Sequence, residues 1–194
     1  MSFHFDPVEH KYYLDGIEIP GATSILKSCG LIDDRYYSPE SADRGRRVHL
    51  ACQYLSEGDL DWESLGEDIR GYVEGFGEFL QAYKFQGIEL EVPIYHPVMR
   101  YGTTPDQIGN FHPIGTPNPV LVEIKSGSLM EWTALQTALQ AMARWPADYL
   151  EIHRLGVELK KNGLSKVVPF DDPADFDVAI ALVTTVNAQK KYRR

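Results

Sequence analysis

The sequence has little cysteine and no long apolar run. Its 194 residues include only two cysteines, Cys29 and Cys52, too few for a disulfide framework or a four-cysteine metal cluster. No apolar stretch approaches the roughly 20 residues that a membrane helix requires. The opening segment, MSFHFDPVEHKYYLD, lacks the basic and apolar regions of a secretion signal. We therefore expect a cytoplasmic protein that does not interact with a membrane.

Positive charge is also scarce. The chain has 19 basic and 28 acidic residues, a net charge of -9, which excludes a protein that coats nucleic acid nonspecifically, because such binding depends on neutralised phosphates. A local basic groove is still compatible with this balance. Arg44, Arg46 and Arg47 are clustered in one segment and are candidates for phosphate contacts. An exposed helix face explains the same cluster equally well.

The composition is otherwise that of a globular protein, with 43% hydrophobic and 24% charged residues. A chain of this length fits one domain, which we expect to span residues 1–194. Turn signals, helix caps and apolar spacing predict the local structure. The predicted elements are an antiparallel hairpin around Asp15-Gly16, helices over 22–30 and 38–55, a helix over 66–86, at least three strands within 88–125 (IELEVPIY, VMRYG and VLVEI), a helix over 129–144 begun by a capping box at Ser128 and Glu131, strands over 149–159 and 165–170, and a helix over 173–190.

The order of these elements predicts a mixed α/β or α+β fold with one central sheet flanked by helices. Three glycines, Gly71, Gly75 and Gly77, count against the helix over 66–86, because glycine is a poor helix former. No internal repeat or linker divides the chain.

Two opposite charges interrupt an apolar strand in VLVEIKSG, residues 120–127. Strand side chains alternate between faces, so Glu123 and Lys125 project the same way, roughly 6 to 7 Å apart. A buried ion pair is the simplest explanation. It is an incomplete one, because removing both charges from water costs several kcal/mol each. A metal ion and a phosphate between the two groups would account for both charges.

A second carboxylate belongs to the same constellation. Pro105 restricts Thr104 to extended geometry, so Asp106 is presented at the start of an adjoining strand. Two carboxylates on neighbouring strands can share a hard cation such as Mg²⁺, while Lys125 orients water or offsets charge on a phosphate. The residues therefore predict metal-assisted hydrolysis of a phosphodiester.

The E-x-K triplet is weak evidence by itself, because about one copy is expected by chance in a chain of this length. A second copy, Glu158-Leu159-Lys160, is indeed present. The two copies differ in context. Glu158 leads into the turn Lys161-Asn162-Gly163, whereas Glu123 follows a Pro-Asp pair and precedes a predicted helix.

These motifs resemble the signature of the PD-(D/E)xK nuclease superfamily, namely Pro105-Asp106 followed by Glu123-Ile124-Lys125. The likeness is stronger to its RecB-like branch, which includes phage exonucleases of the lambda-exonuclease type. PGATSILKSCGL resembles the N-terminal segment of that branch, RGRRVH resembles its Gly-x-x-x-His helix, and ALQTALQAMA resembles its glutamine helix. The four motifs occur in the expected order across roughly residues 3–185.

The resemblance implies a restriction-endonuclease-like core that binds Mg²⁺ or Mn²⁺. It assigns the metal ligands to Asp106, Glu123 and the backbone carbonyl of Ile124, with His49 completing the site. It assigns to Lys125 the role of assisting the attacking water. Gln136 would fix that lysine or the scissile phosphate.

Some positions are less well defined. Glu91 stands where many relatives carry an extra carboxylate, although Glu89 is predicted to share its strand face. Gln140 stands where many relatives have tyrosine, and we interpret it as a polar position beside an apolar stripe. Trp132 and Trp145 are interpreted as packing residues.

The resulting hypothesis is a metal-dependent deoxyribonuclease, an exonuclease of phage or prophage recombination that leaves 5′-phosphate ends in the cytoplasm of a bacterial host. The resemblance implies DNA as substrate and a single-strand annealing recombination protein as partner. Relatives form ring-shaped homo-oligomers, and subunit number stays open here. Two alternatives also stay open, a catalytically inactive DNA-binding or assembly module with the nuclease fold and a PD-(D/E)xK endonuclease.

Overall fold

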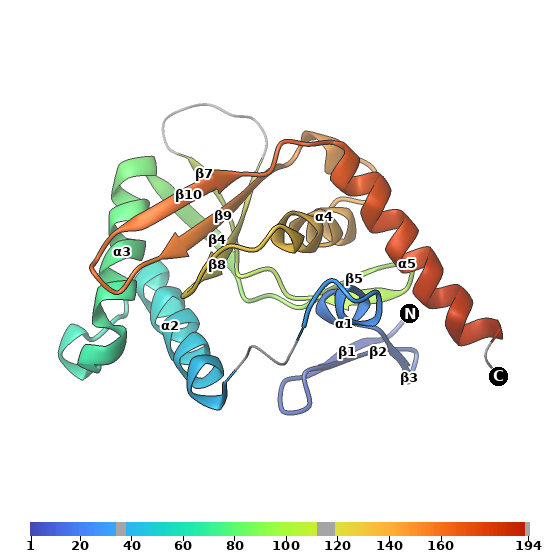
Figure 1. The fold of residues 1–194 in the computed structure, drawn as a ribbon, viewed down its shortest axis with the longest axis horizontal. Coiled ribbons are helices and arrows are strands. Elements are labelled where there is room, and N and C mark those ends of the chain that lie inside the picture. Colours follow the sequence, from blue (N-terminus) through green and yellow to red (C-terminus); the bar gives the residue numbers. More distant parts are fainter. Residues whose placement is uncertain (34–37, 112–118, 193–194) are drawn as a thin grey trace.

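A five-stranded mixed sheet forms the centre of the computed structural model, which describes residues 1–33, 38–111 and 119–192 (Figure 1). Its strand order is β10-β9-β8-β7-β4. The β8–β9 pair is parallel and the other pairs are antiparallel. This arrangement confirms the predicted mixed α/β class. The strands are β4 (Phe85–Leu90), β7 (Gln107–Phe111), β8 (Val120–Lys125), β9 (His153–Leu159) and β10 (Ser165–Pro169).

Helices cover both faces of this sheet (Figure 1). The apolar side chains of β8 divide between them, since Val120, Val122 and Ile124 pack in the core under α2 and α3, whereas Leu121 packs in the core under α1, α4 and α5. The alternation predicted for this strand is thereby confirmed, and Glu123 and Lys125 lie on the α4 side. The helices are α1 (Ala22–Ser28), α2 (Pro39–Glu57), α3 (Glu67–Tyr83), α4 (Trp132–Arg144) and α5 (Ala174–Tyr192), with short 3-10 turns η2 (Trp62–Ser64) and η3 (Tyr149–Glu151).

The helix predicted from Ser38 is confirmed with its caps. The Ser38 hydroxyl accepts a hydrogen bond from the Ser41 amide at 3.2 Å, and Pro39 occupies the first turn. Gly58 ends the helix in the left-handed conformation, with φ of 76°. Because α2 is long and capped at both ends, it can place side chains on two different faces.

The N-terminal segment forms three strands instead of the predicted pair: β1 (Phe3–Asp6), β2 (Lys11–Leu14) and β3 (Ile17–Ile19). The predicted turn at Asp15-Gly16 joins β2 to β3. The additional turn precedes β2, where the Asp6 carboxylate accepts hydrogen bonds from the Val8 and Glu9 amides at 2.9 and 3.1 Å. Such aspartate turns close a hairpin without glycine.

The continuous strand predicted over IELEVPIY is wrong. Glu91 has φ of 50°, and the chain there leaves the central sheet. β5 (Ile94–His96) and β6 (Tyr101–Thr103) pair in a separate two-stranded sheet. The strand predicted over VMRYG is also shorter, because residues 97–100 form the turn between β5 and β6. The His96 Nδ1 atom accepts hydrogen bonds from the Val98 and Met99 amides at 3.2 and 3.1 Å and fixes that turn.

The predicted capping box is wrong as well. α4 begins at Trp132, and the residue before it, Glu131, makes no side-chain cap. The preceding loop is held elsewhere, because the Leu129 amide donates a hydrogen bond to Glu158 Oε2 at 3.1 Å. The Leu129 side chain packs over Gly156 of β9. These contacts keep the Ser128 segment out of the helix.

The glycines of α3 permit close packing. A Cβ atom on Gly71 would overlap the Lys161 carbonyl oxygen, and one on Gly75 would lie 2.6 Å from the Leu164 carbonyl oxygen. Gly77 faces Leu55 Cδ2 at an ordinary 3.7 Å. The helix over Glu67–Tyr83 is therefore continuous despite its glycines. Two of them lack a side chain where the backbone of the β9–β10 turn packs against the helix.

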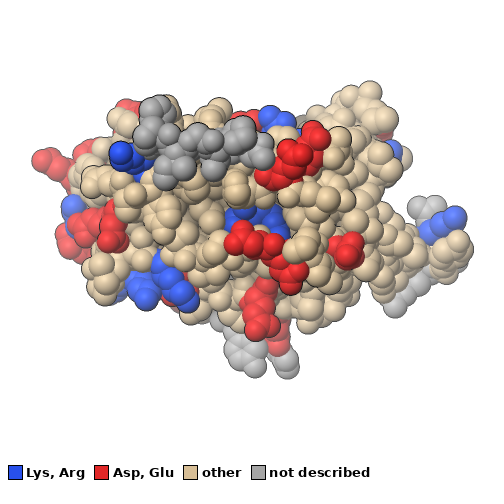
Figure 2. All heavy atoms as spheres, turned by 90° about the horizontal axis from the view of Figure 1, so that it is seen from above, with Lys and Arg blue, Asp and Glu red and all other residues tan. Residues whose placement is uncertain are grey.

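On the face drawn in Figure 2, lysine and arginine side chains lie in small separate groups, with acidic side chains between them, consistent with the net charge of -9. Within the described ranges, none of the helices combines the length and apolar character needed to cross a membrane.

Alanine substitution distinguishes the three glycines. We expect Gly71→Ala and Gly75→Ala each to lower the free energy of unfolding by about 1–3 kcal/mol through overpacking. Gly77→Ala is the matched control and should raise it by about 0.5–1 kcal/mol, since alanine is the better helix former. Urea unfolding followed by circular dichroism measures the differences. Equal effects at all three positions would contradict the packing described.

Candidate active site

Two buried carboxylates lie side by side at one end of the central sheet. Asp106 directly precedes β7, and Glu123 lies on β8, whose Val122 pairs with Gln107. The Ile124 amide donates a hydrogen bond to Asp106 Oδ2 at 2.6 Å. Asp106 and Glu123 are only 6% and 1% exposed. As expected from the sequence, the structure brings the two carboxylates together across adjoining strands.

Lys125 completes this part of the site. Its Nζ atom lies 2.6 Å from Glu123 Oε1 and donates to Gln136 Oε1 at 3.3 Å. The ammonium group also lies 5.4 Å from the centre of the Trp132 ring, a favourable cation–π contact. Trp132 therefore packs as expected and also restrains the lysine.

Two glutamine side chains of α4 donate further hydrogen bonds to Glu123. Gln136 Nε2 donates to Glu123 Oε1 at 2.7 Å, and Gln140 Nε2 donates to Glu123 Oε2 at 2.8 Å. The interpretation of Gln140 as a polar position beside an apolar stripe is wrong, because this side chain is fully buried against the carboxylate. Its spacing of four residues from Gln136 places both amides on one helix face, a signal available in the sequence.

α2 brings His49 to the same place from the other side of the sheet. His49 Nδ1 lies 3.3 Å from Asp106 Oδ1 and 3.4 Å from Glu91 Oε1. The Glu91 amide donates to the Asp106 carbonyl at 3.0 Å, which fixes the bend after β4. Glu89, the alternative to Glu91, instead pairs with Arg144 at 2.6 Å. Of these two glutamates, the site contains Glu91.

The donor set fits a divalent cation. One ligand atom each from His49, Glu91 and Asp106 all lie within 4.8 Å of one another. Carboxylate oxygens suit Mg²⁺ and Mn²⁺, and Mn²⁺ also accepts an imidazole. Glu123 borders this cluster, with its oxygens directed to the lysine and the two amides. The Ile124 amide donates its hydrogen bond to Asp106, and the role of the Ile124 carbonyl as a metal ligand stays a prediction.

The electrostatics follow from burial and proximity. Burial opposes the charged imidazole of His49, but the negative charges of Asp106 and Glu91 outweigh it and hold its pKa well above the ordinary value. Burial also opposes the ionised Asp106, yet His49 and Lys125 keep its pKa lowered. Burial and the neighbouring Asp106 raise the pKa of Glu123, and burial likewise raises that of Glu91. The carboxylates thus raise one another's pKa values by repulsion, and a divalent cation between them would relieve that repulsion.

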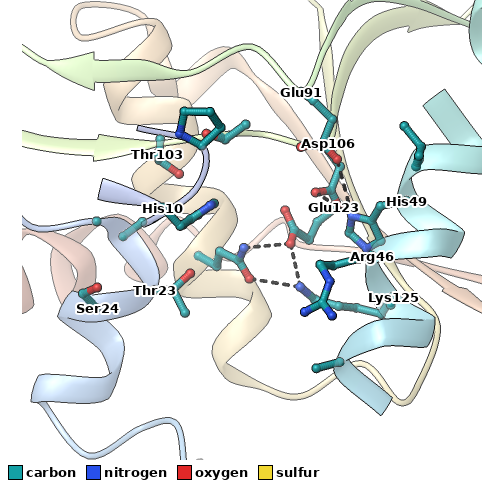
Figure 3. Close-up of a pocket in the computed structure, with 18 of the residues that line it drawn as sticks. His10, Thr23, Ser24, Arg46, His49, Glu91, Thr103, Asp106, Glu123 and Lys125 are labelled. Atoms are coloured by element: carbon teal, nitrogen blue, oxygen red, sulfur yellow. Dashed lines mark hydrogen bonds and ion pairs between the residues drawn. The ribbon is translucent and has the colours of Figure 1, made fainter. Parts of the chain in front are cut away.

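A cavity of about 730 Å³ opens onto these groups (Figure 3). Arg46 lies at this cavity, as does Gly45, which leaves space beside His49. Arg44 and Arg47 line a different hollow, near Asp68. The predicted arginine cluster is thus divided between two faces of α2.

Sequence comparison adds no assignment: no family model matches the chain, and no curated protein matches it. Among solved structures, a protein of Eubacterium rectale provisionally named an exonuclease is similar, with 13% identity and a TM-score of 0.48 over 82% of this chain and 68% of that one. LHK-Exo, solved in complex with dAMP, is similar with 15% identity and a TM-score of 0.40 over 90% of this chain and 89% of that one. Since both TM-scores are below 0.5, the case for a function rests on the side chains of the site.

Replacement of Gln140 tests its contact with Glu123. Gln140→Met should lower the free energy of unfolding by about 1–3 kcal/mol, because a buried carboxylate loses a donor. Thr133 of the same helix is the control, since its hydroxyl is buried without a partner among the described residues. Thr133→Val should be neutral or stabilising in the same denaturant titration. Loss of stability in both variants alike would count against a specific role for the amide.

The raised pKa of His49 predicts how pH affects metal uptake. In the metal-free protein His49 keeps its proton above the ordinary value of 6.5, so a cation that uses this imidazole must displace that proton. Mn²⁺ affinity measured by calorimetry should therefore rise from neutral to alkaline pH, with proton release on binding. In Asp106→Asn the His49 pKa, followed by NMR, should fall. An affinity independent of pH would show that His49 is not a ligand.

Proposed function

We propose that this chain is a metal-dependent deoxyribonuclease that hydrolyses phosphodiester bonds. The observation that carries the proposal is the convergence of Asp106, Glu123 and Lys125 with His49 and Glu91 in one open cavity. Charged groups taken out of water need a compensating role. A divalent cation together with a phosphate would satisfy both signs of charge in this cavity.

The position of each residue indicates its role in the proposed hydrolysis. Asp106, Glu91 and His49 would hold Mg²⁺ or Mn²⁺, with Glu123 next to them. When bound, the metal polarises a phosphoryl oxygen and lowers the pKa of water. The two glutamines of α4 keep Glu123 in one orientation, and Glu123 in turn anchors Lys125.

Lys125 acts on the phosphate side of the site. Its side chain lines the cavity and is 23% exposed, and its ammonium group is restrained by Glu123, Gln136 and Trp132. A fixed cation of this kind orients an attacking water or offsets negative charge that develops on the phosphate. Arg46 at the same cavity supplies a second positive group for the DNA backbone.

The finer parts of the proposal follow from the motif resemblance. They are exonuclease action that leaves 5′-phosphate ends, a PD-(D/E)xK fold within a single domain over residues 1–194, a role in phage or prophage recombination in the bacterial cytoplasm, and an annealing protein as partner. Assembly into a homo-oligomer belongs to the same set.

Cleavage assays test the proposal with a matched pair of lysines. Purified Lys125→Ala should lose about 100-fold or more of the Mg²⁺- or Mn²⁺-dependent cleavage of DNA. Lys160→Ala, in the second E-x-K triplet, should keep full activity, because Lys160 is exposed at the end of β9. Linear and circular DNA are compared, since an exonuclease degrades only the linear form.

Circular dichroism should show that both variants are folded, and chelator should abolish cleavage by the wild type. Full activity of Lys125→Ala, or cleavage in chelator, would contradict the mechanism. A folded wild type that binds DNA and never cuts it would favour the inactive DNA-binding module.

A further inference from the structure

The N-terminal sheet forms a wall of the active-site cavity. Pro7, His10 and Tyr12 line the cavity that also contains Glu123 and Lys125. In Figure 3, His10 points into this cavity from the side opposite His49 and Arg46. None of these three N-terminal residues takes part in the mechanism described above. Their position beside the reacting groups raises the question of what they bind.

This wall is fixed to the strand that presents Asp106. The Tyr12 hydroxyl lies 3.0 Å from Thr104 Oγ1, two residues before Asp106. The Tyr12 ring is buried against Gly102 of β6, where a Cβ atom would overlap it. The Gly102 amide also donates to the Pro20 carbonyl at 2.9 Å. The N-terminal sheet and the Asp106 segment are therefore positioned as one unit.

His10 is held in an unusual conformation at this wall. Its φ of 50° is uncommon for a residue other than glycine. The ring packs edge-to-face with Phe5 and Tyr12, with centroid distances of 5.2 and 5.8 Å, yet the residue is exposed to the cavity. Burial of the ring against these neighbours lowers the pKa of His10.

The two walls differ in charge. Among the described residues, the lysine and arginine side chains that line the cavity are Lys125 of β8 and Arg46 of α2. The turn of the N-terminal sheet contributes the rings of Pro7 and His10. A nucleic-acid strand in this cavity would thus direct its phosphates toward α2 and its bases toward His10. An aromatic ring such as the imidazole stacks on bases with little sequence preference, and the proline ring adds apolar surface beside it.

Given the proposed nuclease function, we infer that Pro7 and His10 form a base-binding subsite for one unpaired nucleotide next to the scissile phosphate. Stacking on a side chain requires a base that has left the duplex. The preferred substrate is therefore single-stranded DNA or a frayed end. His10 is a specificity-determining residue, and the metal site retains its own function without it.

The test compares normal and abasic DNA. Dissociation constants are measured by fluorescence anisotropy in chelator, with single-stranded oligothymidylate and with the same oligonucleotide lacking its terminal bases. His10→Asn removes the ring and keeps a residue that tolerates positive φ. His4→Asn is the control, because His4 is exposed on β1 of the same sheet and does not line the cavity.

The wild type and His4→Asn should bind the normal oligonucleotide about tenfold more tightly than the abasic one. His10→Asn should bind both equally. In Mn²⁺, His10→Asn should raise KM on single strands about tenfold with kcat within about twofold. A base preference that persists in His10→Asn, or an equal loss of affinity for both oligonucleotides, would overturn the subsite.

The same data separate the subsite from the nuclease assignment. If the wild type cleaves DNA and His10→Asn behaves like the wild type, the subsite falls and the nuclease stands. If base preference depends on His10 and the wild type never cleaves, the subsite stands as part of a DNA-binding module.

Discussion

The structure depends on the cost of placing two carboxylates next to each other out of water. Asp106 and Glu123 are almost completely buried on adjoining strands, where each would repel the other and both would lose hydration. Three neighbouring elements supply donors to them: β8 gives the Ile124 amide, α2 gives His49, and α4 gives two side-chain amides. A divalent cation between the carboxylates would relieve the repulsion that these donors leave.

The same constraint explains features that are distant from the carboxylates. The bend after β4 brings Glu91 to the cluster, and the Asp106 carbonyl holds that bend. The long α2 carries His49 on one flank, while Arg44 and Arg47 serve a different hollow on another. The N-terminal sheet is tied to the Asp106 segment and closes the cavity opposite α2. Each element contributes one side of a single cavity.

The features that depend on local periodicity and on helix caps could be predicted from the sequence. The alternation along β8 placed Glu123 and Lys125 on one face, and the Ser38 and Gly58 caps bounded α2. The features that depend on contacts between residues far apart in the sequence could not. Leu129 is held by Glu158, so no helix begins at Ser128. Glu89 and Glu91 separate because the bend at Glu91 breaks the strand, and the burial of Gln140 depends on how α4 crosses the sheet.

The central claim is that His49, Glu91 and Asp106, beside Glu123, surround one divalent cation. Crystals soaked in Mn²⁺ and measured at a wavelength with strong manganese anomalous scattering test it most directly. We expect an anomalous peak within bonding distance of the Glu91 and Asp106 carboxylates and of the His49 imidazole. An empty site at saturating Mn²⁺, in crystals that diffract well enough to show the side chains, would contradict it.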